Sequence, residues 1–514
     1  MSGASESGLP QGGAMTETGS PQGGHAAQSG PPRGGPGGKM RGDLTQGPIL
    51  RTLIMFSIPT LMANVLQSLS GTVNSIWVGR LIGEEALAAT ANANIVMFLV
   101  SSAAFGFGMA GTVKIGQRFG ARDVDGARRT FGTAVGFCSL LMIAIAALGW
   151  YVAPGLLSLL KTPAGAYPLA LTYLRIIFLS MPFMMVSIIL TMGLRGTGDS
   201  RTPLIFMGVT VAIDAVFNPL LIAGFGPIPP LGIAGSALAT MLASFISFLG
   251  MIVYVYAKDL PLRLRGSEIA YLRPRRDELG FIITKGMPMG AQMLVMSAAG
   301  IIVVGLVNRE GLLMTAAYGA AMQLFTYIQM PAMAIGGAVS AMAAQFIGAR
   351  KWDRLDHVTR AGVIVNFVMT GILTIILLLL DRPALGLFLG PDSPAVPLGR
   401  HIQLLASWNF IFFGVTMVYS ATMRAGGAVM VPLIIIAVAL YPVRLGFYWL
   451  TYDWLGADAI WFSFPVGAFA GLVLGWWFYH YSSWREVARG EDEEEAVEQA
   501  QASGEPAGRF KPSV

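Results

Sequence analysis

Charged residues are scarce in this sequence. Asp, Glu, Lys and Arg make up 12% of the 514 residues, and hydrophobic residues make up 54%. About a quarter of the residues are charged in soluble domains, so this composition excludes that class and predicts an integral membrane protein. The net charge of +6 comes mainly from basic residues in loops between apolar runs. Orientation in a bilayer explains these residues, and we expect no nucleic-acid partner.

Cysteine and histidine are also scarce. Cys138 is the single cysteine, which excludes an intramolecular disulfide. The histidines are dispersed at His25, His357, His401 and His480, and no loop is long enough for a catalytic domain. The phosphate-binding pattern G-x-x-x-x-G-K-S/T is missing, which disfavours an ATP-driven pump. We therefore expect no enzyme, no cofactor and no resident metal.

Apolar runs long enough to cross about 30 Å of hydrocarbon recur along the chain. Proline, glycine and charged residues separate these runs and indicate twelve membrane spans. The predicted spans lie near residues 53–76, 86–110, 130–153, 167–193, 203–224, 233–257, 280–307, 314–343, 360–380, 401–422, 431–452 and 460–481. An even number of spans places both termini on the same side of the membrane.

The distribution of Lys and Arg predicts which side that is. The loops after the second and sixth spans, within residues 114–129 and 258–276, are rich in Lys and Arg, whereas the alternate loops are poor in both. Basic loops stay in the cytoplasm. We therefore expect a multi-pass protein of the plasma (inner) membrane with both termini in the cytoplasm.

Composition also divides the chain into segments. Residues 1–47 are rich in Gly, Pro, Ser and Gln and lack the apolar core of a signal peptide. The predicted segments are a disordered cytoplasmic tail at 1–47, an N-lobe at 48–257, a basic cytoplasmic linker at 258–279, a C-lobe at 280–485 and an acidic C-terminal tail at 486–514.

An internal repeat relates the two lobes. QRFGAR at 117–122 corresponds to QFIGAR at 345–350, an offset of 228, and Pro203 corresponds to Pro432, an offset of 229. Six spans separate the repeats, so both lobes have the same orientation, related by a pseudo-two-fold axis along the membrane normal. The predicted fold is an all-α membrane protein with twelve transmembrane helices in two six-helix lobes. Substrate is expected to bind between the lobes.

Several motifs identify a resemblance to a known family. They are IPTLMANVLQSLSGTVNSIWVGRLIGEEALAA, GQRFGARD, GLRGTGDSRTP, DAVFNPLLIAG and LGIAGSALAT, within a match from about residue 48 to 485. The chain resembles the multidrug and toxic compound extrusion (MATE) family, most closely its DinF-like and archaeal-like branch. The resemblance implies export of organic, often cationic, compounds in exchange for protons or sodium. A lipid-linked precursor flippase or a single-metabolite exporter of the same superfamily is the alternative.

The chain departs from the family pattern at its acidic positions. Family members usually have an acid in the first span where VNSIWVG places Asn74. In the fifth span, Asp214 stands where the family has Asn, and Asn218 stands where the family has Asp. One carboxylate thus remains where such proteins often have two.

Asp214 is the central candidate for cation coupling. A charged Asp in the middle of the bilayer costs roughly 2.5–3.5 kcal/mol, so its side chain should face the interior of the lobe. Asn218 follows one helical turn later on the same face. By the resemblance, Asn74 stands where the family has a coupling acid, and Thr240 supplies a further hydroxyl group to the predicted coupling site. Protonation of Asp214, or transient capture of sodium there, is expected to favour a state with weak substrate affinity; a purely structural role is the alternative.

Further polar residues are predicted to line the interior. The first span carries a polar stripe that we expect to pack towards the fifth span, with Pro59 bending the helix. The stripe comprises Asn64, Gln67, Ser68, Gly71, Asn74 and Ser75. Candidate substrate contacts are Gln292, Gln323, Tyr327 and Met184. Arg444 in the eleventh span can either pair with Asp214 across the cleft or anchor its own lobe. The expected partners are membrane lipid and small organic substrates, and we expect a monomer.

Overall fold

Helices account for nearly all of the structure, a computed structural model that describes residues 42–224, 226 and 229–490. No strand occurs among these residues, which confirms the all-α prediction. The first half contains α1 (Ile49–Leu81), α2 (Glu84–Gly120), α3 (Val124–Leu159), α4 (Tyr167–Gly196), α5 (Arg201–Ala223) and α6 (Ile233–Ala257). The predicted tails lie outside the described residues over 1–41 and 491–514.

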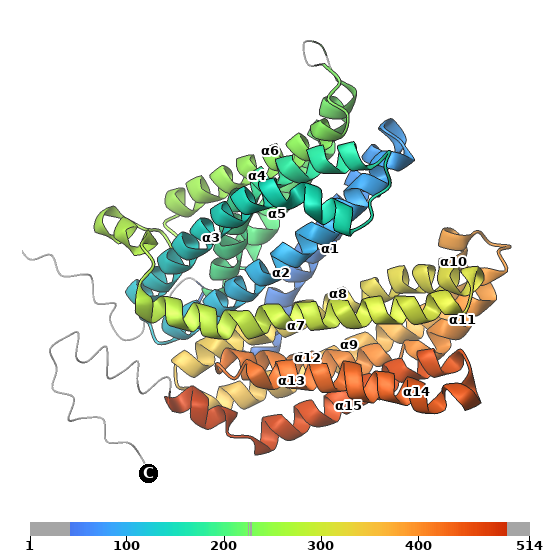
Figure 1. Ribbon diagram of the computed structural model, residues 1–514. Coiled ribbons are helices and arrows are strands. Elements are labelled where there is room, and N and C mark those ends of the chain that lie inside the picture. Colours follow the sequence, from blue (N-terminus) through green and yellow to red (C-terminus); the bar gives the residue numbers. More distant parts are fainter. Residues whose placement is uncertain (1–41, 225, 227–228, 491–514) are drawn as a thin grey trace, which may run out of the picture. The chain divides into compact units, whose positions relative to one another are not determined.

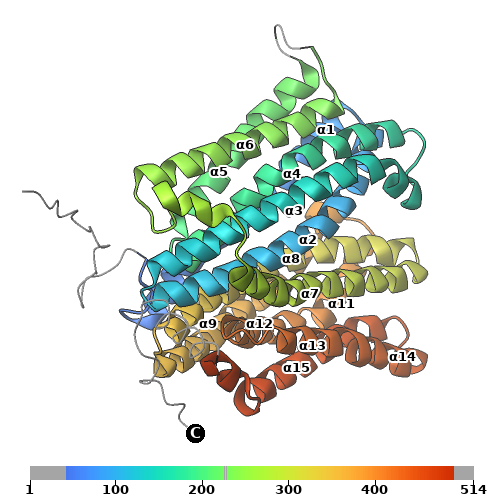
Figure 2. The same cartoon turned by 60° about the vertical axis from the view of Figure 1, so that its left-hand side comes forward.

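The second half follows a short 3-10 helix, η1 (Gly266–Leu272). It contains α7 (Arg276–Arg309), α8 (Leu312–Gly348), α9 (Trp352–Leu379), α10 (Asp381–Leu389), α11 (Ala395–Ala406), α12 (Asn409–Ala425), α13 (Met430–Val438), a π-helical turn (Ala439–Val443), α14 (Arg444–Leu455) and α15 (Asp458–Tyr481). Figures 1 and 2 show the blue-to-green helices of the first half packed together, and likewise the yellow-to-red helices of the second half.

The number of spans agrees with the prediction. Within the described residues, 11 helices are long and apolar enough to cross a membrane, and α11 with α12, bent by 42°, can supply the twelfth. The eleventh predicted span is divided into α13 and α14 by the π-helical turn. The sequence did not predict α10, which forms because Leu385 is buried in the apolar core of the C-lobe.

The first helix of each lobe also packs against the other lobe. α1 packs against α8 of the other lobe, and α7 packs against α2. Because α1 corresponds to α7 and α2 to α8 in the internal repeat, these two contacts are equivalent. Both contacts involve the half of each helix nearest the basic loops. Leu53 and Phe56 of α1 pack with the last third of α8, and Gly106 of α2 lies against Gly286 and Gly290 of α7. We call this the basic end of the helices.

Glycines allow α2 and α8 to approach closely at the basic end. A Cβ added at Gly120 would overlap the backbone of Gln345, and a Cβ added at Gly348 would overlap the backbone of Gln117. The repeat relates Gly120 to Gly348, because 348 − 120 is 228. The lobes therefore meet through a pair of symmetry-related backbone contacts that no larger residue could make.

Two glutamines cross between the lobes at the same place. Gln117 Nε2 donates to the carbonyl oxygen of Ala425 at 2.8 Å, and Gln345 Nε2 donates to that of Gly196 at 2.9 Å. The donors are 228 apart and the acceptors 229 apart, which matches the repeat. We call these two residues the glutamine pair. They close the basic end with hydrogen bonds that are equivalent in the two lobes.

The residues just before α1 also belong to this end. Leu44 is buried against α8, and its backbone N–H donates to Gln345 Oε1 at 2.8 Å. Lys351 Nζ donates to Thr45 Oγ1 at 3.1 Å. Residues 42–47, which composition assigned to the tail, therefore pack against the C-lobe. They supply an apolar side chain, Leu44, that is buried against α8, and a backbone N–H whose hydrogen bond is accepted by Gln345 of α8.

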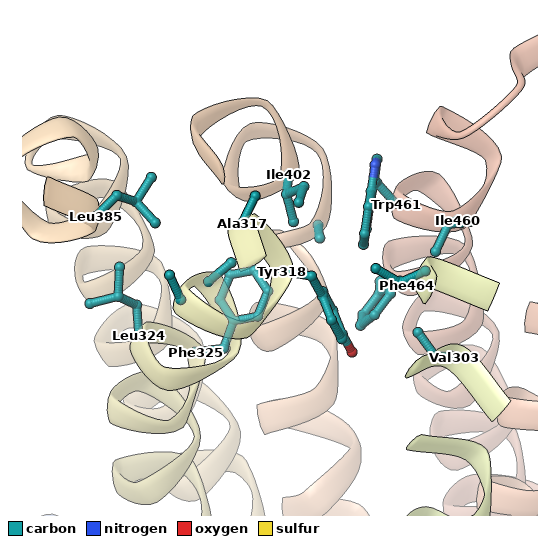
Figure 3. Close-up of a cluster of buried hydrophobic side chains, with 14 of the residues drawn as sticks. Val303, Ala317, Tyr318, Leu324, Phe325, Leu385, Ile402, Ile460, Trp461 and Phe464 are labelled. Atoms are coloured by element: carbon teal, nitrogen blue, oxygen red, sulfur yellow. The ribbon is translucent and has the colours of Figure 1, made fainter. Parts of the chain in front are cut away.

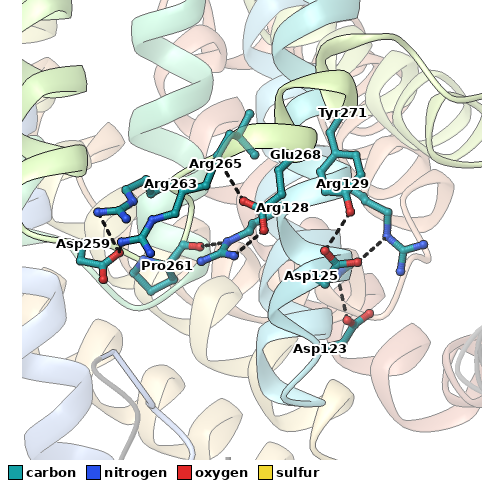
Figure 4. Close-up of polar contacts among 12 residues, drawn as sticks. Asp123, Asp125, Arg128, Arg129, Asp259, Pro261, Arg263, Arg265, Glu268 and Tyr271 are labelled. Carbon is teal, nitrogen blue, oxygen red and sulfur yellow. Dashed lines mark hydrogen bonds and ion pairs between the residues drawn. The ribbon is translucent and has the colours of Figure 1, made fainter. Parts of the chain in front are cut away.

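The predicted linker is folded onto the N-lobe (Figure 4). Arg128 of α3 donates to the Pro261 carbonyl oxygen and to Glu268 Oε1, both at 2.8 Å. The Tyr271 hydroxyl donates to Asp125 Oδ1 at 2.9 Å. These contacts fix η1 on α3, so the linker joins the lobes from a defined position on the N-lobe.

The opposite end of the C-lobe contains an apolar core (Figure 3). Trp461 and Phe464 of α15 pack with Tyr318 of α8, and the ring centroids of Tyr318 and Trp461 are 5.5 Å apart. Phe325 of α8 packs on Phe410 of α12 with centroids 5.0 Å apart. Such a core holds α8, α12 and α15 together as one body.

The close contact at the basic end predicts the effect of adding a methyl group. We expect Gly120→Ala and Gly348→Ala each to lower the free energy of unfolding by about 1–3 kcal/mol, because the new Cβ must displace backbone of the opposing helix. Thermal unfolding in detergent measures this. Gly371→Ala is the control, since no atom lies within 4 Å of its added Cβ. Equal midpoints for the three variants would contradict the assigned contact.

Candidate functional site

Asp214 lies inside the N-lobe, as the cost of exposing it to lipid requires. It is 3% exposed and lies 13 residues after the start of α5, about 20 Å along the helix at 1.5 Å per residue. α5 has 23 residues, so Asp214 is close to its middle. Asn218 is fully buried one turn later on the same face.

Side chains from three other helices surround this face of α5. Thr240 Oγ1 of α6 donates to Asp214 Oδ1 at 3.1 Å, and Ser70 and Asn218 also face the carboxylate. Asn74 Oδ1 of α1 accepts from Asn218 Nδ2 at 2.7 Å and from Ser236 Oγ at 2.8 Å. Asn74 Nδ2 donates to the Tyr173 hydroxyl of α4 at 3.5 Å. The N-lobe polar cluster comprises Ser70, Asn74, Tyr173, Asp214, Asn218, Ser236 and Thr240.

One acceptor of the N-lobe polar cluster is unsatisfied. Asn218 Oδ1 is buried without a hydrogen-bond partner among the described residues. A buried amide oxygen without a donor, in a cluster that also contains a carboxylate, is a candidate ligand for a cation that binds there. Pro219 has no N–H, which leaves the Ala215 carbonyl next to Asp214 without its usual helical donor. The cluster thus has the chemistry to bind a proton or a small oxygen-seeking cation.

A cavity of about 760 Å³ lies between the lobes, away from the basic end. The N-lobe side is formed by small and polar residues of α1 and α2, and the C-lobe side by residues of α8 and α10. The lining residues are Ser68, Gly71, Thr72, Ser75, Asn94, Ala316, Gly319, Ala320, Gln323, Phe388 and Leu389. Hydroxyl and amide groups dominate its polar lining, and none of these residues is charged.

α1 contributes to both the cavity and the N-lobe polar cluster. Ser70 and Asn74 face the cluster, whereas Gly71, Thr72 and Ser75 line the cavity. Towards the basic end, the same helix contacts α8 through Leu53 and Phe56. A change in the partners of Asn74 therefore acts on the helix that also forms the cavity wall and the contact between the lobes.

The predicted polar stripe of α1 does not pack as one surface. Asn74 reaches α5, as expected, but Ser68, Gly71 and Ser75 line the cavity. Asn64 is half-buried and Gln67 is exposed, and neither is in the cluster or the cavity lining. At 100° per residue the stripe covers about 120° of the helix, so its two edges face different neighbours. Pro59 is buried, and α1 remains helical through it.

The four candidate substrate contacts have different surroundings. Gln323 lines the cavity. Gln292 is instead buried, where its Oε1 accepts from Arg424 Nη1 at 3.2 Å, because that buried arginine requires an acceptor. Met184 is half-buried and its sulfur accepts from Ser180 Oγ at 3.5 Å. Tyr327 is 55% exposed but lies outside the cavity lining.

Sequence reasoning missed several residues of the site. Ser236 lies one turn before Thr240 on α6, so the same helical spacing that linked Asp214 to Asn218 pointed to it. Asn94 is an amide within a membrane span, which is a signal for an interior position. Nothing in the sequence distinguished Ser70 from other small residues of α1 or indicated that Tyr173 would reach Asn74.

Comparisons with known proteins agree with this architecture. A family model described as MatE matches residues 59–220 and 288–450, one segment in each lobe. A protein of Bacillus subtilis (strain 168), "Probable multidrug resistance protein YoeA", is 34% identical over 435 residues, which are 84% of this chain and 94% of that protein. A "FAD transporter" of Shewanella oneidensis is 26% identical over 350 residues, 68% of this chain and 76% of that protein.

Solved structures share the fold. One is described as the "Outward-facing conformation of a multidrug resistance MATE family transporter of the MOP superfamily". It superposes with a TM-score of 0.79 at 21% sequence identity and covers 87% of this chain and 100% of that chain.

The hydrogen bonds of Asn74 predict how the cluster responds to its loss. Asn74→Leu leaves the Asn218 amide and the Ser236 hydroxyl without their shared acceptor, and each unpaired buried group costs about 1–3 kcal/mol. We therefore expect a lower midpoint of thermal unfolding in detergent. Gln67→Leu on the same helix is the control, since Gln67 is exposed. The assigned network is wrong if Asn74→Leu is as stable as Gln67→Leu.

Proposed function

Because the chain belongs to the MATE family of membrane transporters, we propose that it is a secondary active antiporter that exports organic, often cationic, compounds in exchange for protons or sodium ions. The observation that carries this proposal is the single buried carboxylate of the N-lobe polar cluster, Asp214, which accepts a hydrogen bond from Thr240 of α6. α1 supplies Asn74 to the same cluster and also lines the cavity between the lobes. The antiporter's energy source is the ion gradient, without a cofactor, and it acts as a monomer.

The charge distribution supports an orientation for this transporter. The basic end carries the Lys- and Arg-rich segments 114–129 and 258–276, so we assign it to the cytoplasm of a cell with its plasma (inner) membrane around the protein. Both termini are then cytoplasmic. With the basic end closed by the glutamine pair, the cavity of about 760 Å³ faces outward. This is the state from which an exporter releases its substrate.

Coupling follows from the two surfaces of α1. A proton or sodium ion entering from outside binds Asp214, which changes the hydrogen bonds that Asn218 makes with Asp214 and with Asn74. Because α1 also lines the cavity, substrate and ion affect each other's affinity through this helix, and the coupling is reciprocal. The ion drives transport only to the extent that it binds the two states differently.

Alternating access requires the basic end to open. The symmetry-related contacts that close it include the two hydrogen bonds of the glutamine pair, which contribute together about 1–3 kcal/mol. Contacts of this strength are weak enough for an ion gradient to break. The lobes then rock as two bodies about the site between them.

Export of a single metabolite is the second candidate function. It is supported by the relative described as a "FAD transporter" and by the uncharged cavity lining, which does not itself select a cation. A lipid-linked precursor flippase is the third, since Phe388 and Leu389 give the cavity an apolar edge.

Dye efflux tests the role of Asp214. In proteoliposomes we expect an imposed proton or sodium gradient to drive efflux of a cationic dye by the wild-type protein. Asp214→Asn should bind the dye but lose gradient-driven efflux, because the amide cannot take up a proton or balance a cation's charge. Asp392→Asn, in an exposed loop, should behave like the wild type. Driven efflux by Asp214→Asn would show that coupling lies elsewhere.

The same vesicles separate the alternatives. Efflux of the dye but not of FAD, and no flipping of a fluorescent lipid, supports the antiporter of organic cations. Gradient-driven FAD transport without dye efflux would instead identify a metabolite exporter, and lipid flipping would identify a flippase.

Loss of the glutamine pair should favour the state that is open at the basic end. In a Cys138→Ser background, Ala344→Cys, at a position buried in α8, reports that state by reacting with a membrane-impermeant maleimide. Gln117→Ala with Gln345→Ala should raise the labelling rate about tenfold, since 1.4 kcal/mol is a factor of ten. Gln323→Ala, on the cavity side of α8, is the control. No increase in labelling would exclude the glutamine pair from closure.

A further inference from the structure

The C-lobe contains a buried cation without a counterion. Arg444, at the start of α14, is 9% exposed, and its guanidinium lies over the Phe464 ring, 3.5 Å from the ring centroid. Figure 3 shows Phe464 beside Tyr318 and Trp461 in the apolar core. Among the described residues Arg444 has no hydrogen-bond or ion-pair partner, and its Nε is buried and unpaired. It therefore does not pair with Asp214, which is buried in the N-lobe.

Two other buried or half-buried arginines have polar partners: Arg424 donates to Gln292, and Arg118 forms an ion pair with Glu278 at 2.5 Å. Arg175 and Arg195, like Arg444, have a buried Nε without a hydrogen-bond partner among the described residues, but neither lines a cavity with other polar side chains as Arg444 does. The aromatic face of Phe464 satisfies the charge of Arg444 only in part, because a guanidinium stacked on a ring still directs its N–H groups sideways, in its own plane. Leaving these donors unused inside a membrane protein is costly.

Arg444 lines a cavity of about 60 Å³ between α7, α12, α13–α14 and α15. Two further polar side chains, Asn409 and Thr416, line it, together with apolar residues. The apolar lining includes Met296, Phe413, Met417 and Phe464. No lining residue is acidic. This volume holds about two waters at their liquid volume of about 30 Å³ each, or one small oxyanion group.

The local backbone creates this cavity. The π-helical turn Ala439–Val443 ends immediately before Arg444 and contains Pro442, which has no N–H. Such turns are common at functional sites because they change the direction of the following side chain. Across the cavity, a Cβ added at Gly467 would lie 3.1 Å from Arg444 Cβ, so the absence of a side chain there makes room for the arginine.

The internal repeat places this cation opposite in character to Asp214. The offset of 229 relates Arg444 to position 215, since 444 − 229 is 215, which is adjacent to Asp214. Equivalent depths of the two lobes thus carry a carboxylate and a guanidinium, and each is buried in its own lobe. A carboxylate can bind a cation and a guanidinium can bind an anion, so the two positions have complementary chemistry.

We propose that the Arg444 cavity is a binding site for a small organic monocarboxylate of about the size of acetate. The carboxylate accepts from the N–H groups of Arg444, since guanidinium binds carboxylates strongly, with Asn409 and Thr416 beside it. The alkyl group of the ligand contacts the apolar lining, which includes Phe413, Met296 and Met417. The positive charge rejects organic cations, so this site is distinct from the interlobe cavity and does not depend on the proposed antiport.

Calorimetric titration of the purified full-length protein tests the site, with sodium acetate as the ligand and acetamide as its neutral counterpart of similar shape. We expect acetate to bind and acetamide not to bind. Arg444→Gln should weaken acetate binding at least tenfold. Gly471→Ala adds a methyl group to the lining of the cavity at an ordinary contact distance, 3.4 Å from Ala439 Cβ, and should weaken binding several-fold.

Two variants are expected to bind acetate like the wild type. Gly475→Ala, on the same helix but outside the lining, is the matched control for Gly471→Ala. Asp214→Asn removes the buried carboxylate of the other lobe. If Arg444→Gln does not fold, Gly471→Ala and the comparison with acetamide decide. The proposal fails if wild type does not bind acetate, if acetamide binds equally well, if Gly471→Ala leaves binding unchanged, or if Asp214→Asn abolishes it.

Discussion

A carboxylate in the middle of a membrane-spanning helix requires partners, and the N-lobe is organised around that requirement. Asp214 lies near the centre of α5, and α1, α4 and α6 each turn a polar side chain towards its face. Exposure of the charge to lipid would cost several kcal/mol, so these helices cannot rotate freely about their axes. The N-lobe polar cluster therefore fixes which face of α1 is left to line the cavity between the lobes.

The internal repeat is preserved where the lobes meet and lost in the interiors of the lobes. Gly120 and Gly348, and Gln117 and Gln345, occupy equivalent positions and make equivalent contacts. Symmetry at this interface gives both lobes the same contacts at the basic end. The interiors differ, because an acid lies in one lobe and Arg444 lies near the equivalent position of the other. A common scaffold thus contains two buried groups of opposite charge.

Much of this could be predicted from the sequence. The thickness of hydrocarbon fixes the length of a span, so the twelve spans and the two lobes followed from apolar runs and the repeat. Helical spacing grouped Asp214 with Asn218, and the high cost of polar groups in lipid placed Asn74 beside them. These inferences rest on local periodicity and on the cost of placing polar groups in lipid, which is large enough to outweigh other contributions to folding.

Other features depend on packing between distant segments, which local pattern does not encode. The division of the α1 stripe between cluster and cavity depends on where α8 lies. Gln292 contacts Arg424 because a buried arginine 132 residues away needed an acceptor. Residues 42–47 read as tail by composition, yet Leu44 is buried against α8. The π-helical turn before Arg444 had no recognisable sequence signal beyond Pro442.

The central claim is that Asp214 and the substrate in the interlobe cavity compete through α1. The most direct test is to measure ions released when a cationic dye binds the purified protein, using a pH indicator in weak buffer and a sodium electrode in parallel. The account predicts release of about one proton or one sodium ion per dye bound by the wild type, and none by Asp214→Asn. Dye binding with no ion release, or equal release by both proteins, would contradict it.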